Sequence, residues 1–187
     1  MVKKENQRIL LTKRLLQDGL LQLLETKELD RISVTELCRV SGINRATFYN
    51  HYASPQDLLS DMEGQLTSDL DKLMDYPTNY DESLAQLEAI CTYMYEHKRP
   101  IVILSRCNVD SDLVEIFHRL NDFFPRRSPK SRLTANMDQA SLSMTATFVY
   151  TGCYHLILEW LVMGYEKTPR EIAELILNIL TKEIQYN

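Results

Sequence analysis

Polar side chains at helical spacing follow Asn44, and their types suit contact with another molecule. The outward positions of a helix over residues 45–51 would hold Arg45, Ala46, Thr47, Tyr49 and Asn50. An arginine can donate two hydrogen bonds to one guanine, an alanine can touch a thymine methyl group, and hydroxyl groups can bind phosphate. A single helix is also narrow enough to enter the major groove of DNA. The segment therefore predicts a nucleic-acid interface.

The common sequence signatures of catalysis are absent. The sequence has no G-x-S-x-G, H-E-x-x-H, phosphate-binding loop or dinucleotide fingerprint, and no nucleophile stands beside a plausible base. Its four cysteines lie far apart without a C-x-x-C pair, and its four histidines do not cluster with them. We therefore expect no enzyme activity, no cofactor and no metal site, and we interpret the cysteines as small core residues.

The helices that must position the polar segment have readable start signals. Ser33-Val-Thr-Glu36 is a capping box that begins a helix reaching about Val40. Gly42 supplies the turn, and Asn44 can cap the next helix. Ser54-Pro-Gln-Asp57 then begins a fourth helix, which we expect to end near residue 75. With a first helix over residues 6–25, this is a helix-turn-helix arrangement, whose inward side chains are Val34, Leu37, Ile43, Phe48 and Tyr52.

The string ISVTELCRVSGINRATFYNHYASPQDLL resembles the DNA-binding head of the TetR/AcrR family of transcriptional regulators. The similarity extends from Ile9 to about Leu59, and the letters T-F-Y-N-H-Y are its most specific part. The C-terminal string GCYHLILEWLVMGYEKTPREIAELIL resembles, more loosely, the closing helix pair of a Gram-positive-type subgroup.

The resemblance assigns roles to individual side chains. It implies that Arg45, Ala46 and Asn50 lie nearest the bases, and that phosphates or sugar edges are met by Ser33, Thr35, Thr47, Tyr49 and His51. Asn44, at the start of the reading helix, completes the expected DNA-binding set. Simpler roles stay open for three of these residues. Tyr49 could pack the head against the body, His51 could cap a helix end, and Arg45 could be a solvated charge. Pro55 stands where many relatives have a phosphate-binding lysine, which leaves the N–H groups of the helix start as phosphate donors.

The resemblance also implies a function and an assembly. We expect a sequence-specific transcriptional regulator that acts as a repressor. It would bind a palindromic operator on double-stranded DNA as a homodimer. An effector bound in the body would release or modulate it. The alternative is a DNA-binding co-activator, or a regulator controlled by a protein partner, with no small-molecule ligand. Residues 1–53 would bind DNA and residues 54–187 would regulate and dimerise, with a helix over about 54–75 connecting the two.

Charge is distributed in the way that this division requires. Residues 1–60 contain nine Lys/Arg and seven Asp/Glu, whereas residues 61–187 contain twelve and nineteen, for a net charge of −5 overall. A weakly positive head on an acidic body suits a protein that touches phosphate with one end only.

The first twenty residues have no continuous apolar run, and the apolar stretch Thr147–Gly164 is interrupted by Thr151, His155 and Glu159. We therefore expect a cytoplasmic protein without a membrane partner.

Helix signals continue through the body and predict an all-α fold of about nine helices. After residue 75 we expect helices over 81–97, 101–107, 110–124, 137–164 and 168–185, with a basic loop at 125–132. The last two helices are apolar on two sides, which predicts two burial partners, the chain's own core and a second subunit. The expected dimer interface consists of Leu142, Ala146, Val149, Cys153, Trp160, Ala173, Leu177 and Leu180.

Aromatic, methionine and polar side chains mix in the body, and this mixture predicts a pocket for a small apolar effector. The candidate lining residues are Tyr93, Met94, Phe117, Met144, Phe148 and His155. An ordinary helical core is the alternative interpretation of the same residues.

Overall fold

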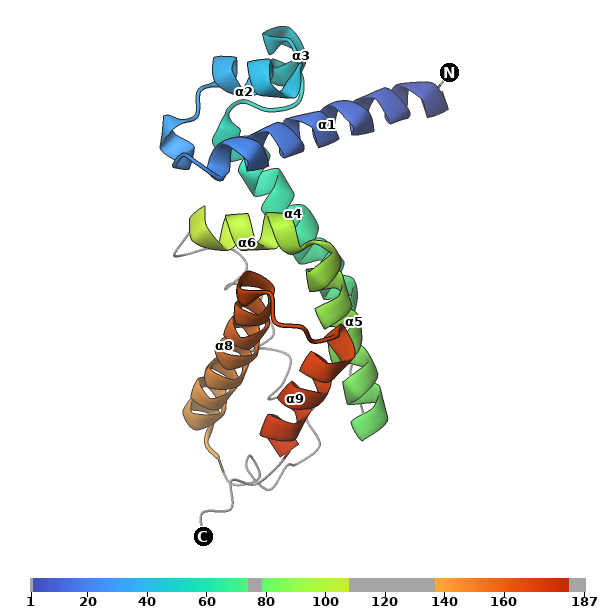
Figure 1. Ribbon diagram of the computed structural model, residues 1–187, viewed down its shortest axis with the longest axis vertical. Coiled ribbons are helices and arrows are strands. Elements are labelled where there is room, and N and C mark those ends of the chain that lie inside the picture. Colours follow the sequence, from blue (N-terminus) through green and yellow to red (C-terminus); the bar gives the residue numbers. More distant parts are fainter. Residues whose placement is uncertain (1, 74–78, 108–136, 182–187) are drawn as a thin grey trace. The chain divides into compact units, whose positions relative to one another are not determined.

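The computed structural model describes residues 2–73, 79–107 and 137–181, and these ranges hold eight α-helices, one 3-10 helix and no strand (Figure 1). The all-α prediction is confirmed. The elements are α1 (Val2–Leu24), η1 (Leu29–Arg31), α2 (Val34–Ser41), α3 (Arg45–Tyr49), α4 (Pro55–Leu73), α5 (Tyr80–Glu96), α6 (Lys98–Cys107), α8 (Gln139–Met163) and α9 (Pro169–Thr181). The expected helix over 110–124 and the basic loop at 125–132 lie outside the described residues. Within the described ranges, no helix is both long and apolar enough to cross a membrane.

The helix ends follow the local chemistry of the sequence, with two differences. Ser33 Oγ accepts from the Glu36 N–H at 3.2 Å, but the Glu36 carboxylate binds Lys27 Nζ at 2.5 Å instead of reaching back to Ser33. Gly42 ends α2 with a φ of 68°, a left-handed conformation that glycine adopts without strain. Pro100 lies in the first turn of α6 instead of ahead of it, and its missing N–H breaks no helical bond there.

The chain divides into two compact units. Met1–Leu66 and Ile103–Val109 form the first, here called the head unit, while Thr67–Val102 and Asp110–Asn187 form the second, the body unit. Two helices, α4 and α6, therefore contribute residues to both units. The domain boundary expected after residue 53 stays a prediction.

The head unit is built around one face of α1. Leu16 and Leu20 of α1, four residues apart, are fully buried, and so are Leu37 of α2, Phe48 of α3 and Leu58 of α4. Burying an aliphatic or aromatic side chain of this size contributes about 1.5–3 kcal/mol. Of the five side chains expected inside, three are buried and two half-buried: Leu37, Phe48 and Tyr52, then Val34 and Ile43.

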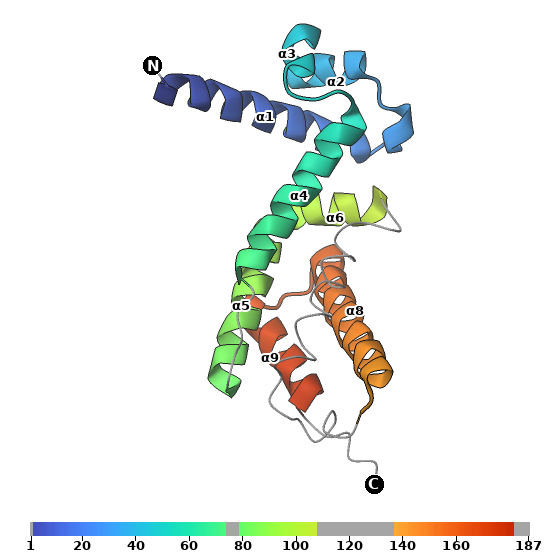
Figure 2. The same ribbon diagram turned by 180° about the vertical axis from the view of Figure 1, so that it is seen from behind.

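In the body unit, α5 and α9 lie side by side, as the two opposite views agree (Figures 1 and 2), and α9 also contacts α8. Arg170 of α9 pairs with Glu88 of α5 through Nη1 and Oε2, 3.2 Å apart. The Tyr95 ring of α5 stacks on Trp160 of α8, with centroids 5.4 Å apart. Cys91 of α5 is buried, and burial raises the pKa of its thiol to about 12, in agreement with a core role.

Helices α1 and α2 approach each other closely at Gly19, a residue that the sequence analysis did not single out. A Cβ atom at Gly19 would lie 2.1 Å from Ser41 Oγ, 3.2 Å from Ser41 Cβ and 3.3 Å from Ser41 N. Ser41 is buried, and its hydroxyl has no hydrogen-bond partner in the described part of the chain. The missing side chain at Gly19 therefore sets how closely the two helices pack.

Gly19→Ala should destabilise the protein, although alanine favours a helix over glycine by about 1 kcal/mol. The added methyl group would overlap Ser41, and overpacking of this kind costs roughly 1–3 kcal/mol. Gly64→Ala in α4 is the matched control, because a Cβ atom there meets nothing within 4 Å and only helix propensity changes. The urea midpoints of the two variants should move in opposite directions. A more stable Gly19→Ala variant would show that Ser41 or the two helices can shift to accept the methyl group at little cost.

Candidate nucleic-acid interface

Helix α3 spans only five residues, and its ends are held by groups outside its own ladder of hydrogen bonds. Asn44 Oδ1 accepts from the Thr47 N–H at 2.8 Å, which satisfies one of the free donors at the helix start. Phe48 is 0% exposed, so one face of α3 is fixed in the core of the head unit. The remaining faces are presented to solvent.

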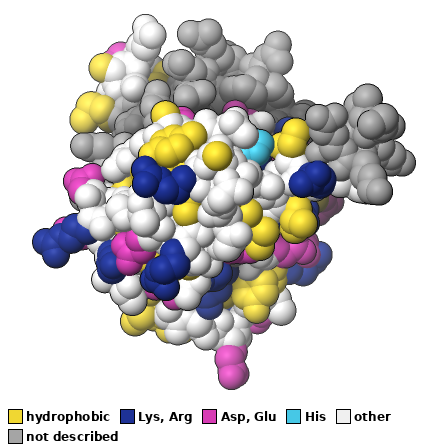
Figure 3. All heavy atoms as spheres, turned by 90° about the horizontal axis from the view of Figure 1, so that it is seen from above, with side chains coloured by type: hydrophobic (Ala, Val, Ile, Leu, Met, Phe, Trp, Pro, Cys, Tyr) yellow, Lys and Arg dark blue, Asp and Glu magenta, His cyan; other side chains and the backbone are white. Residues whose placement is uncertain are grey.

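Most of the expected DNA-binding residues are accessible on the segment that contains α2, the turn and α3. Thr47 and His51 are half-buried, and the exposed members are Ser33, Thr35, Asn44, Arg45, Ala46, Tyr49 and Asn50. Figure 3 looks onto the end of Figure 1 that carries α2 and α3, and there Lys and Arg side chains are spread among acidic, apolar and uncharged polar ones. The fold thus leaves a short, polar and partly basic surface open to a partner.

Arg45 is placed by a residue one helical turn away. Its guanidinium carbon lies 6.0 Å from the centroid of the Tyr49 ring, a cation–π distance, and that ring meets Phe48 edge-on at 5.5 Å. Arg45 forms no ion pair within the ranges that the structure describes. Its guanidinium donors therefore stay available to a base edge or a phosphate. Tyr49 itself is 51% exposed.

Arg39 is a further exposed cation on this surface, and the sequence analysis missed it. It follows Thr35 by four residues on α2, so the two side chains share one face of the helix. Among the described residues it has no acidic partner, in contrast to Lys27, which binds Glu36. Its spacing from Thr35 was the signal available in the sequence. A hydroxyl and a guanidinium on one face suit phosphate contacts.

The start of α4 is less suited to phosphate than the sequence suggests. Ser54 Oγ accepts from the Asp57 N–H at 3.1 Å, and Asp57 Oδ2 accepts from the Ala53 N–H at 2.9 Å. Pro55 is buried in the first position of the helix and has no N–H to donate. The positive end of the α4 dipole is therefore already matched by the Asp57 carboxylate.

Asp61 of α4 joins three segments of the head unit. Its Oδ2 atom accepts from the Tyr52 hydroxyl at 2.6 Å, from Gln65 Nε2 at 3.0 Å and from Lys13 Nζ at 3.1 Å. Burial would raise the pKa of Asp61, but the hydrogen bonds from Tyr52, Lys13 and Gln65 and the charge of Lys13 together outweigh it and hold the pKa below its usual value. Burial, and next the same hydrogen bond, raise the pKa of Tyr52. We call these four residues the Asp61 hub. Only Tyr52 was singled out from the sequence.

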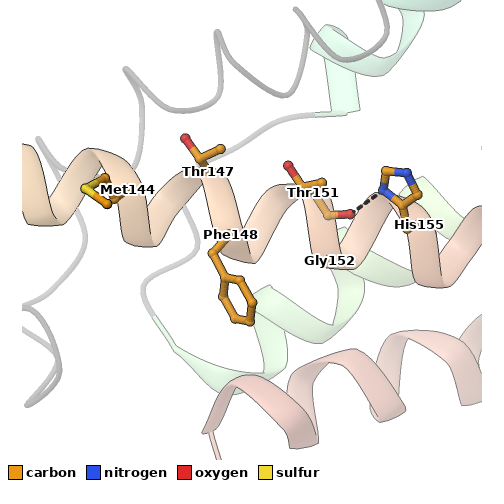
Figure 4. Close-up of a pocket in the computed structure, with 6 residues that line it drawn as sticks. All are labelled: Met144, Thr147, Phe148, Thr151, Gly152 and His155. Atoms are coloured by element: carbon orange, nitrogen blue, oxygen red, sulfur yellow. Dashed lines mark hydrogen bonds between the residues drawn. The ribbon is translucent and has the colours of Figure 1, made fainter. Parts of the chain in front are cut away.

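The side chains expected to line an effector pocket do not share one lining in the described part of the chain. An open groove on α8 is lined by Met144, Thr147, Phe148, Thr151, Gly152 and His155, and Figure 4 shows that all six come from this one helix. Met94 lies in the core of the body unit, and the Tyr93 ring stacks on His97 at 4.1 Å. Phe117 lies outside the described residues. The α8 members of the expected set are thus separate from Tyr93 and Met94.

The residues of the expected dimer interface differ in burial along α8 and α9, and the interface itself stays a prediction. Trp160, Ala173 and Leu177 are buried within the body unit. Leu142, Val149 and Cys153 are half-buried and Leu180 is exposed, while nothing is described of the Ala146 side chain. The most exposed apolar side chains of α8 belong to the other stripe, where Met144 is 74% and Phe148 80% exposed.

Comparison with known proteins identifies the family. A model of the TetR type, described as "Transcriptional regulator C-terminal region", matches residues 81–182, more than half of the chain. Over 61 residues, 32% of this chain, the sequence is 38% identical to the uncharacterized HTH-type transcriptional regulator YxbF of Bacillus subtilis. The match covers 16% of the length of that relative. The chain belongs to the TetR/AcrR family of transcriptional regulators, as the resemblance predicted.

Solved structures share the fold. A TetR-family transcriptional regulator from Syntrophomonas wolfei superposes with a TM-score of 0.68 over 94% of this chain and 98% of that chain, at 16% identity. The dihydroxyacetone kinase operon activator DhaS superposes with a TM-score of 0.56 over 90% and 93%, at 18% identity. At these identities the likeness establishes the fold.

Asn44→Ala should loosen α3, because it removes the acceptor for the Thr47 N–H. Loss of such a cap costs about 0.5–2 kcal/mol. Asn44→Ser is the matched control, since its hydroxyl oxygen can accept the same hydrogen bond. Urea midpoints should place the serine variant near the wild type and the alanine variant below both. Equal midpoints for the two variants would mean that the packing of Phe48 holds α3 without this cap.

Proposed function

We propose that this regulator reads a palindromic DNA sequence with α3 and binds it as a homodimer. The observation that carries the proposal is Arg45, which is exposed in the first turn of a capped helix and has no ion-pair partner among the described residues. In helix-turn-helix proteins this turn reaches the base edges. A guanidinium can bridge O6 and N7 of guanine, an interaction worth about 1–3 kcal/mol of discrimination. Ala46 and Asn50 are the other side chains that we assign to the bases.

Phosphate contacts would position α3 and carry no sequence information themselves. We assign them to the polar side chains around the base-reading residues: Ser33, Thr35, Arg39, Thr47, Tyr49 and His51. The net charge of residues 1–60 is small. Affinity for DNA must therefore come from these individual hydrogen-bond donors, and not from the broad positive field that a strongly basic protein would have. We therefore expect each lost donor to weaken binding to all sequences about equally.

A two-fold dimer needs a self-complementary surface, and the exposed face of α8 supports one. Met144, Phe148, Gly152, His155 and Val162 recur at helical spacing along it, and all are exposed. A Cβ atom at Gly152 would meet nothing within 4 Å, so a second helix could approach the backbone there. Exposed apolar surface of this kind is typical of a protein–protein contact. Paired α8 helices from two subunits would form the centre of a helical bundle.

The sense of regulation that we propose is repression, because a dimer bound across a promoter excludes other proteins from the same DNA. Release by an effector stays a prediction, and so does control by a protein partner. The described part of the α8 groove is open and identifies neither ligand. The dimer and the reading helix do not depend on either one.

Selection from random DNA should return a palindrome for the wild type, with half-sites about one helical turn apart. Arg45→Ala should flatten the preference at one symmetric pair of positions, with about 1–3 kcal/mol of discrimination lost at each. Arg14→Ala, which removes an exposed arginine of α1, is the control and should leave the preferred sequence unchanged. If the Arg45→Ala variant selects the same DNA sequences as the wild type, Arg45 would be assigned to phosphate binding instead. A wild-type protein that selects no sequence would refute the proposed function.

Phe148→Glu should convert the dimer to a monomer, because it places one charge from each subunit in the apolar contact. Tyr80→Glu serves as control, since Tyr80 is an exposed aromatic residue at the start of α5 and outside the α8 stripe. Light scattering at micromolar concentration measures the mass of each variant. A dimeric Phe148→Glu variant would place the interface on another face.

A further inference from the structure

The Asp61 hub ties the residue just beyond α3 to both long helices of the head unit. Lys13 comes from α1, Asp61 and Gln65 come from α4, and Tyr52 follows α3. Lys13 Nζ also lies 5.3 Å from the centroid of the Tyr52 ring. A second link, from Gln17 Nε2 to Gln65 Oε1 at 3.2 Å, repeats the connection between α1 and α4 one turn along both helices.

Tyr52 moves with α3, because the two are joined by backbone and ring contacts. The Tyr52 N–H donates to the Phe48 carbonyl at 3.0 Å, and the two rings have centroids 6.1 Å apart. The Tyr52 side chain is buried, and its 2.6 Å hydrogen bond to Asp61 has the length of a charge-assisted O–H···O bond. One carboxylate oxygen thus connects the end of α3 to α4 and, through Lys13, to α1.

The charge of Asp61 works against a partner made of phosphates. A carboxylate in the head unit repels DNA, and its pairing with Lys13 withdraws one cation from the surface. By charge alone, removing Asp61 should strengthen DNA binding. If removal of Asp61 weakens DNA binding, the cause must therefore be a change in the position of the DNA-binding residues on α3.

We propose that Asp61 is a positioning residue, which holds α3 in the orientation that reads DNA by accepting the Tyr52 hydroxyl and the Lys13 ammonium group. The inference rests on the proposed function and adds the interaction that fixes the orientation of the five-residue helix α3 for contact with the bases. Without the hub, α3 populates other orientations, and the apparent affinity falls with the fraction of molecules in which α3 is correctly placed.

The test uses the full-length protein with three variants, Asp61→Asn, Tyr52→Phe and the double variant. Asp18→Asn is the matched control, because Asp18 is an exposed acid of α1 without an ion-pair partner in the described ranges. The urea midpoint of every variant is recorded, and two further measurements are made at a temperature where every variant is folded. The first is affinity for the selected DNA at one salt concentration, and the second is amide hydrogen exchange over residues 44–52 without DNA.

Each single variant of the hub should bind DNA roughly three- to tenfold more weakly than the wild type. Asp18→Asn should bind as tightly as the wild type or more tightly. The double variant should lose less affinity than the sum of the two single losses, because both substitutions act on the hydrogen bond between the Tyr52 hydroxyl and the Asp61 side chain. Amides over residues 44–52 should exchange faster in the hub variants and unchanged in Asp18→Asn. A purely stabilising role would lower the urea midpoint and leave the affinity of the folded protein unchanged.

Unchanged affinity in Asp61→Asn, or a gain equal to that of Asp18→Asn, would overturn the proposal. Additive losses in the double variant would also overturn it, because the hydroxyl and the carboxylate would then act separately. Failure of the wild type to bind any DNA would refute the proposed function instead. The exchange measurement on the free protein would still decide whether Asp61 holds α3 in place.

Discussion

A helix of five residues does not sustain itself in water. Isolated helices shorter than about 12 residues are marginal even with favourable composition, because the first turn orders several residues for a single hydrogen bond. Helix α3 is far below that length, so its stability has to come from its surroundings. The cap at Asn44, the left-handed turn at Gly42, the buried ring of Phe48 and the link from Tyr52 to Asp61 are those surroundings. Much of the head unit can be understood from this constraint.

These supports act by different physics. Burial of Phe48 is non-directional and keeps α3 on the core, whereas the hydrogen bonds at Asn44 and Tyr52 define its angle and register. The close packing of α1 on α2 at Gly19 and Ser41 fixes the distance between the two helices that carry α3. A reading helix needs both kinds of support, since specific contacts with base edges tolerate little movement.

Helix α8 shows the opposite situation. Its length gives it a complete hydrogen-bond ladder, with Asp138 capping the start and Gly164 ending it in a left-handed conformation. Because the helix holds itself, its faces are free to serve different partners. One face packs Tyr154, Ile157 and Leu161 into the body unit, and the opposite face leaves Met144 and Phe148 in solvent. An exposed apolar face on a helix that is already stable is where a second subunit would gain most.

Local chemistry in the sequence determined the all-α class, the helix starts at Ser33 and Asn44 and the turn at Gly42, because each depends on residues within four positions of one another. The string T-F-Y-N-H-Y was enough to indicate the family. Periodicity also revealed that α8 has two apolar stripes, but both have the same spacing, and only packing against α9 and α5 decided that Trp160 turns inward and Phe148 outward. Lys13 and Asp61 are 48 positions apart and leave no joint pattern in the chain. The tertiary structure alone brings them to Tyr52, because the crossing of α1 and α4 places one carboxylate oxygen within reach of both donors.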